Sequence, residues 1–154
     1  MQGAAKVKGT RPDPKYGDEN VTVFVNNLMI DGKKDKAFNI FYDALKKVKE
    51  KTNEDELEVF KTALTNVGPL VEVRSRRVGG ATFQIPQEVP PNRKMSLAMK
   101  WLIRFSRNRQ EKTIQDNLAA ELIAAYNEEG GAYKKKQETH KMAEANKAFS
   151  HFKF

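Results

Sequence analysis

The 154-residue chain contains no cysteine and only two histidines, His140 and His151. The lack of thiols excludes disulfides, thiol nucleophiles and cysteine-based metal sites, and two histidines leave little for acid–base or metal chemistry. No set of serine, histidine and aspartate has a recognisable context, and the glycine pairs match no phosphate-binding loop. The sequence therefore predicts no enzyme activity, no cofactor, no metal site and no small-molecule substrate.

Long apolar runs are also missing. No stretch of about 18 consecutive apolar residues occurs, so the sequence predicts no transmembrane helix and no membrane partner. Residues 1–19 combine glycines and prolines with almost no apolar periodicity, and they lack the hydrophobic centre of a signal peptide. We expect these residues to form an extended N-terminal tail ahead of a single domain over residues 20–154.

Positive charge is in excess and is concentrated in one stretch. Lysines and arginines number 28 against 20 acidic residues, a net charge of +8. Residues 70–109 hold nine of these cations and only two acidic residues, whereas the charges of residues 20–69 balance. A block of one sign fits a phosphate-binding surface better than an ordinary solvated face, where the signs are interspersed. A basic face that only aids solubility stays open as the alternative.

Apolar residues recur at intervals of three and four over five segments, which is typical of amphipathic helices, and a sixth helix is expected after Gly130-Gly131. The helices are predicted to begin near residues 20, 35, 54, 92, 113 and 132. Gly32 and Gly68 are expected to end the first and the third, and the last is expected to reach Phe149. The sequence thus predicts a mainly α fold, a six-helix bundle-like domain.

The period changes to two over residues 70–89, between the third and fourth of these helices. Two alternating runs joined by Gly79-Gly80 predict a protruding β-hairpin arm with a tight primed turn. Pro86 lacks a backbone donor, so its strand cannot be a central one. Because a lone two-stranded ribbon is marginal in water, we expect the arm to lean on helices or on a ligand.

Arginines and lysines gather on this hairpin and on the helix that follows it. Arg74 and Arg76 share one face of the ribbon, and Arg77 points to the other. A helical projection gives the next helix a narrow stripe of four cations with no acidic residue over residues 90–110. The stripe consists of Arg93, Lys100, Arg104 and Arg107. Contacts to phosphates would explain both groups of cations. Without a ligand, the hairpin arginines would protect the edges of the ribbon from pairing with another strand, and the helix stripe would be an ordinary solvated face.

A basic ribbon on a helical body also suits a DNA-bending architectural protein that clasps a minor groove. Such proteins often carry an apolar wedge at the tip of the ribbon, whereas the tip here is Gly79-Gly80. The sequence therefore favours RNA as the polyanion and keeps DNA as the alternative.

Several strings in the chain are similar to those of one known family. They are PDPKYG (12–17), FVNNLMIDGKK (24–34), VEVRSRRVGGATFQIPQEV (71–89), LAMKWLI (97–103) and KMAEANKAFSHFKF (141–154). The chain resembles the small-subunit ribosomal protein seven family in its bacterial form. SRRVGG in the hairpin and MAEAN near the C-terminus are highly specific in combination.

The resemblance implies six helices with a ribbon arm and a structural role in the small ribosomal subunit. It implies a primary binder of ribosomal RNA (rRNA) that nucleates assembly of the head of the subunit. It also implies a place near the decoding region, close to the exit-site tRNA and the mRNA path, with ribosomal proteins nine and eleven as neighbours. The expected location is the ribosome in the cytoplasm, with an organellar ribosome as the weaker option.

The resemblance further implies which residues face each ligand. Those expected to face rRNA are Lys6, Lys8, Arg11, Lys33, Lys34, Arg74, Arg76, Arg77, Arg93, Lys94, Lys100, Arg104 and Arg107. Those expected near tRNA or mRNA are Val78, Gly79, Gly80, Lys141 and Lys147. The chain departs from the family in its N-terminal segment, which offers only three cations where members usually have an arginine- and lysine-rich tail.

Overall fold

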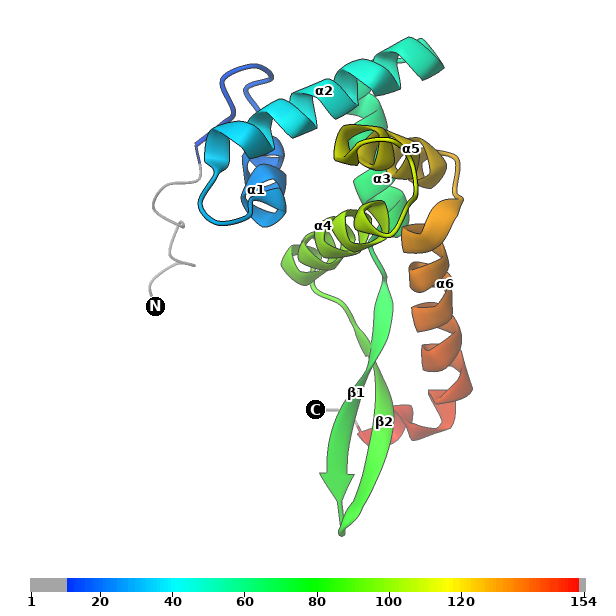
Figure 1. Ribbon diagram of the computed structural model, residues 1–154. Helices are drawn as coiled ribbons and strands as arrows, with labels where there is room; N and C mark the ends of the chain where they lie inside the picture. The colour runs from blue at the N-terminus through cyan, green and yellow to red at the C-terminus, as the bar shows by residue number, and fades with distance from the viewer. Residues whose placement is uncertain (1–10, 153–154) are drawn as a thin grey trace.

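The computed structural model describes residues 11–152 and is mainly helical. Its helices are α1 (Glu19–Leu28), α2 (Lys34–Thr52), α3 (Glu56–Val67), α4 (Pro91–Arg107), α5 (Ile114–Tyr126) and α6 (Gly130–Ala145). Strands β1 (Val71–Val78) and β2 (Ala81–Glu88) lie between α3 and α4, and a 3₁₀ helix η1 (Lys147–Phe152) follows α6. The hairpin extends away from the helical body, and α6 runs beside it (Figure 1). The mainly α class with one hairpin between the third and fourth helices is confirmed.

Three phenylalanines join the first three helices in the core. Phe24 of α1, Phe41 of α2 and Phe60 of α3 are fully buried. Their ring centroids lie 5.0–5.3 Å apart in tilted and edge-on arrangements, which aromatic quadrupoles prefer over flat stacking. All three belong to the apolar faces predicted from helical spacing, so the sequence identified this part of the core.

The buried face of α4 does not include its two large aromatic residues. Met99 and Ile103 lie in the core, whereas Trp101 and Phe105 are only half-buried. Helices α1, α3, α5 and α6 all pack against α4. The helix is therefore covered on more sides than a single apolar stripe requires.

Residues 11–18 form a turn that packs against the helical body. Asp13 is buried, and its carboxylate accepts hydrogen bonds from the N–H groups of Lys15, Tyr16 and Asp18 at 2.8–3.0 Å. The hydroxyl of Tyr42 on α2 donates to the same carboxylate at 3.0 Å. The extended tail was predicted over residues 1–19, of which residues 1–10 lie outside the described part of the chain.

The hairpin has the predicted turn and the predicted alternation of faces. Gly79 and Gly80 both adopt positive φ, 57° and 84°, as a type I′ turn requires. Across the strands Arg74 pairs with Ile85 and Arg76 with Phe83. Ile85 is fully buried and the Phe83 ring lies 5.2 Å from the ring of Phe149 in η1, so this face of the ribbon turns toward the C-terminal elements.

Two predicted helix ends were wrong. The last helix stops at Ala145 and not at Phe149; the side-chain Nδ2 of Asn146 donates to the Met142 carbonyl at 2.7 Å, and the chain then turns into η1. The first helix stops at Leu28, before the predicted Gly32. Neither end follows from local periodicity: Met29, the residue after α1, is extended with ψ 137°, and η1 after α6 packs against β2.

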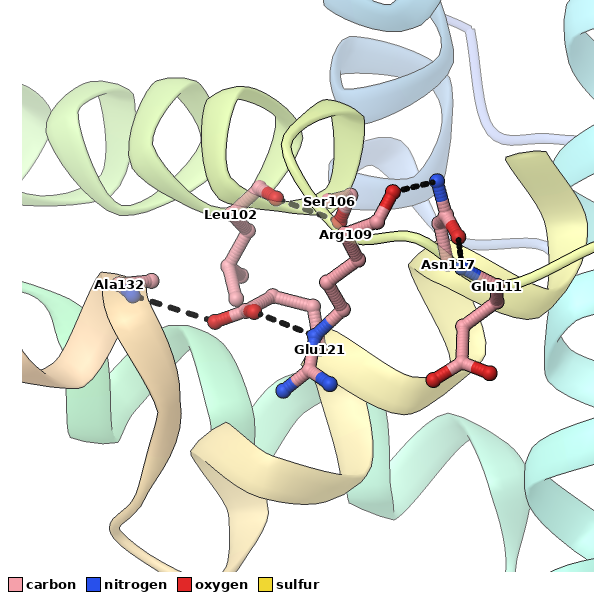
Figure 2. A network of polar contacts seen from close by, with 7 residues as sticks. All are labelled: Leu102, Ser106, Arg109, Glu111, Asn117, Glu121 and Ala132. Carbon is pink, nitrogen blue, oxygen red and sulfur yellow. Dashed lines mark hydrogen bonds and ion pairs between the residues drawn. The ribbon is translucent and has the colours of Figure 1, made fainter.

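A buried polar network fastens the start of α6 to α5 and to the loop after α4 (Figure 2). Glu121 is 1% exposed, and its carboxylate accepts from Arg109 Nε at 2.9 Å and from the N–H of Ala132 at 3.1 Å. Asn117 donates to the carbonyl of Arg109 and accepts from the N–H of Glu111, both at 2.9 Å. Within residues 11–152, no buried side-chain nitrogen or oxygen lacks a hydrogen-bond partner.

We expect Glu121→Gln to destabilise the protein by about 3 kcal/mol. The NH₂ group of the new glutamine would face either Arg109 Nε or the N–H of Ala132, and both of these are donors. Urea denaturation measures this loss. Glu111→Gln serves as the control, since that side chain is exposed and its replacement should change the free energy of unfolding by less than about 0.5 kcal/mol. Equal stabilities of the two variants would contradict this role of Glu121.

Asp13 should make stability fall at acid pH. Burial by itself raises the pKa of the Asp13 carboxyl, but four hydrogen bonds outweigh it, so the pKa lies below its ordinary value. The stabilisation is therefore present above the ordinary pKa of about 4 and is lost as pH falls through the folded-state pKa. Denaturation at about pH 6 and about pH 3 should show the stability gap between wild type and Asp13→Asn shrinking at the lower pH. A gap that stays constant would contradict this assignment.

Candidate nucleic-acid interface

Three exposed cations of α4 line a shallow groove. Lys100, Arg104 and Arg107 lie on its last two turns. The groove has a volume of about 280 Å³, and its other lining residues are Asn27, Ile103 and Asn108. No acidic residue is among those that line it. The groove is therefore an electropositive surface suited to phosphates.

Contacts within the protein hold two of these arginines in place. Arg107 Nη2 donates to the carbonyl of Leu28 at 3.3 Å, where the C-terminal end of α1 carries partial negative charge. The guanidinium carbon of Arg104 lies 5.5 Å from the centroid of the Phe105 ring, a distance at which the ring attracts a cation. Both arginines stay exposed while these contacts restrict their motion.

Arg93, predicted as part of the same stripe, has an acidic partner. Its Nε lies 2.8 and 3.0 Å from the two carboxylate oxygens of Glu72 on β1. Residues 90–110 contain no acidic residue, and the partner of Arg93 comes instead from the hairpin. Arg93 therefore fastens the root of the hairpin to α4, and its contact with RNA stays a prediction.

Lys94 is half-buried at the same root. Its carbon chain crosses Gly68 so closely that a Cβ there would lie 2.5 Å from Lys94 Cγ. Burial lowers the pKa of Lys136 on α6, and the positive charge of Lys94 lowers it further. Two lysines from two helices thus lie near each other where the hairpin leaves the body.

The hairpin arginines occupy both faces of the ribbon, as predicted. Arg74 and Arg76 lie on the face turned toward α6 and η1, and Arg77 lies on the other, opposite Thr82. Arg74 Nη1 donates to the side chain of Gln87 at 3.4 Å. All three arginines are exposed. At the tip, Gly79 and Gly80 are exposed and Val78 is half-buried.

The other predicted cations are spread over separate elements. Lys33 and Lys34 are exposed where α2 begins, and Lys34 Nζ lies 5.9 Å from the centroid of the Phe38 ring. Lys141 on α6 and Lys147 on η1 are exposed. Arg11 is exposed too, and Lys6 and Lys8 lie outside the described residues.

Sequence reasoning missed three residues at this surface. Asn27 and Asn108 line the groove although they carry no charge and belong to no apolar period. Glu72 was not identified as the partner of Arg93 because 21 residues separate them in the chain. Only the tertiary structure brings Asn27 and Glu72 to the cations, whereas Asn108 directly follows Arg107 in the chain.

A histidine joins the root of the hairpin to α6. The N–H of Leu70 donates to His140 Nε2 at 3.0 Å, so this nitrogen is unprotonated. Burial is the larger cause that lowers the pKa of His140, and the charge of Lys136 is the smaller one.

Among residues 11–152, no group of three histidine or acidic residues is placed to hold a metal ion. Within the same range, no helix is long and apolar enough to cross a membrane.

Comparisons with known proteins give one consistent result. The family model described as Ribosomal protein S7p/S5e matches residues 1–147. The small ribosomal subunit protein uS7 of Cytophaga hutchinsonii is 63% identical over 143 residues, covering 93% of this chain and 92% of that protein. The uS7 proteins of Flavobacterium johnsoniae and Natranaerobius thermophilus are 60% and 55% identical, and each alignment covers at least 98% of both chains.

We expect His140 to titrate below the ordinary histidine value of about 6.5. A lowered pKa means that its stabilising contact is complete above the ordinary value and is lost as pH falls through the folded-state pKa. An NMR titration of the His140 ring measures this pKa, and Lys136→Ala should raise it by removing a nearby positive charge. A ring that titrates at or above 6.5 in the wild type would contradict the contact.

Proposed function

The chain belongs to the S7p/S5e family of ribosomal proteins, and from this premise we propose that it binds small-subunit rRNA through the groove of α4 and the hairpin. The family is structural, so the chain is a constituent of the small ribosomal subunit and not an enzyme. A DNA-bending role, the alternative from sequence, is not supported by this family assignment.

The observation that carries the proposal is the groove itself. Lys100, Arg104 and Arg107 are exposed together, and no acidic residue lines the groove with them. Each phosphate that these cations neutralise releases condensed counterions, which favours binding and makes it depend on salt. Arginine adds bidentate contacts and stacking that a lysine does not provide.

The hairpin supplies a second contact at a distance from the helical body. Its root is fastened to α4 by the Arg93–Glu72 ion pair and to α6 by the Leu70–His140 hydrogen bond. An arm held in this way presents Arg74, Arg76 and Arg77 in a restricted range of positions relative to the groove. Folded RNA is recognised largely by shape, so two separated basic surfaces favour one folded region over a random strand.

The finer location rests on the family and on the form of the tip. We place the protein in the head of the small subunit, where it nucleates assembly on rRNA. The tip at Gly79-Gly80 has no side chains, which lets the backbone approach the exit-site tRNA closely. Exposed Lys141 and Lys147 would lie toward mRNA, with ribosomal proteins nine and eleven as neighbours. The protein works bound to the ribosome, in the cytoplasm as for its bacterial relatives.

Removing two groove cations should weaken binding to a head-domain rRNA transcript. For Lys100→Ala with Arg104→Ala we expect a loss of at least about tenfold at moderate salt, and a log–log salt slope lowered in magnitude by about 1.5, because each lost phosphate contact contributes about 0.7–0.9. Filter binding over a salt series measures both quantities.

Lys49→Ala with Lys51→Ala is the matched control. Both lysines are exposed in the last turn of α2 and do not line the groove, and the variant loses the same net charge. If the control weakens binding as much as the groove variant does, net charge explains the effect and the proposed surface is wrong.

A further inference from the structure

We propose that the groove between the ends of α1 and α4 holds one unpaired RNA nucleotide, whose base is read by Asn27 and Asn108. The inference rests on the proposed function and deepens it, since it separates the residues that select a sequence from those that bind any phosphate. The cations Lys100, Arg104 and Arg107 hold the phosphates on either side of this nucleotide.

The groove is lined by uncharged as well as charged residues, whereas a surface that only attracts phosphates needs charged ones alone. Two carboxamides and one aliphatic residue lie among three cations in about 280 Å³. Ile103 is only 4% exposed and belongs to the core, so it supplies a small, fixed apolar part of the groove floor for a base to contact. The cations surround this contact with the charge that the flanking phosphates need.

Asn27 is held in one orientation by the protein. Its Nδ2 donates to the carbonyl of Val23 one turn earlier at 3.0 Å. The same Nδ2 also donates to Met99 Sδ at 3.9 Å, so both amide hydrogens face protein acceptors and the carbonyl oxygen is left for a ligand. Asn27 is exposed, so this oxygen is open to RNA.

Asn108 is the C-cap of α4, where its backbone N–H bonds to the carbonyl of Ser106. Within the described chain its side chain takes part in no hydrogen bond, and it is exposed on the groove. Its donor and acceptor are therefore both available. The bond from Arg107 to the carbonyl of Leu28 joins the ends of the two helices, so it also limits how far the two carboxamides can separate.

Carboxamides and cations do different work on nucleic acid. Contacts to phosphates position a protein without reading sequence, whereas contacts to base edges specify it. The carboxamide of Asn108 presents a donor beside an acceptor, which matches the adjacent donor and acceptor on one edge of adenine, and the oxygen of Asn27 adds a second acceptor for the base. Those edges are accessible in unpaired RNA and not in the deep major groove of an A-form helix. The groove therefore fits an unpaired purine of the adenine type.

The test compares two RNAs with the full-length protein at one salt concentration. One is a transcript of the small-subunit rRNA head domain, and the other is a shuffled transcript of the same length and composition. Asn27→Ala with Asn108→Ala should bind the head-domain transcript about tenfold more weakly and the shuffled one as the wild type does, with an unchanged salt slope. Asn26→Ala with Asn92→Ala is the matched control, because both are exposed and neither lines the groove.

The outcomes of this test distinguish the proposed function from base reading by the asparagines. If the wild type shows no preference for the head-domain transcript, the proposed function itself fails. If the wild type shows the preference and the groove variant keeps it, or loses affinity for both RNAs equally, base reading by these asparagines is overturned. Asn108→Ala alone removes no hydrogen bond within the described chain, so it tests the inference without affecting folding, with an expected loss of about threefold for the head-domain transcript only.

Discussion

The buried carboxylate of Glu121 is the interaction on which the placement of α6, and through it the hairpin, depends. A charge with 1% exposure is costly unless each oxygen has a partner. The two partners are Arg109 from the loop after α4 and the N–H of Ala132 in the first turn of α6. Gly131 lets this turn approach α4 closely, since a Cβ there would lie 2.5 Å from a ring carbon of Phe105. The start of α6 is thus fixed against two other helices.

Helix α6, fixed at its start by Glu121, in turn holds the hairpin in place. Helix α6 runs beside β1, and His140 accepts from Leu70 at the point where the hairpin begins (Figure 1). Buried Ile85 and the contact of Phe83 with Phe149 give a two-stranded ribbon the packing that it needs for stability in water. A hairpin that is already ordered loses less conformational entropy when RNA binds. Its contacts with RNA therefore contribute more to the affinity.

The sequence predicted those features that depend on short-range pattern. Helical spacing identified the buried phenylalanines of α1, α2 and α3, and Gly79-Gly80 identified the primed turn. Features that depend on tertiary partners could not be found in the same way. The pairing of Arg93 with Glu72 crosses from helix to hairpin, and the early end of α6 follows from the packing of η1 on β2. The carboxamides of the groove have no periodic or charge signal, whereas the cations beside them were predicted from their spacing.

The central claim is that one surface of the protein, made by the ends of α1 and α4 together with the hairpin, contacts rRNA. Ultraviolet cross-linking of the protein bound to head-domain rRNA, followed by mass-spectrometric mapping of the linked peptides, tests this claim most directly. We expect cross-links in the peptides around Asn27, in residues 97–108 and in residues 71–89. Cross-links confined to the last turn of α2 and the start of α5, with none on α4 or the hairpin, would contradict it.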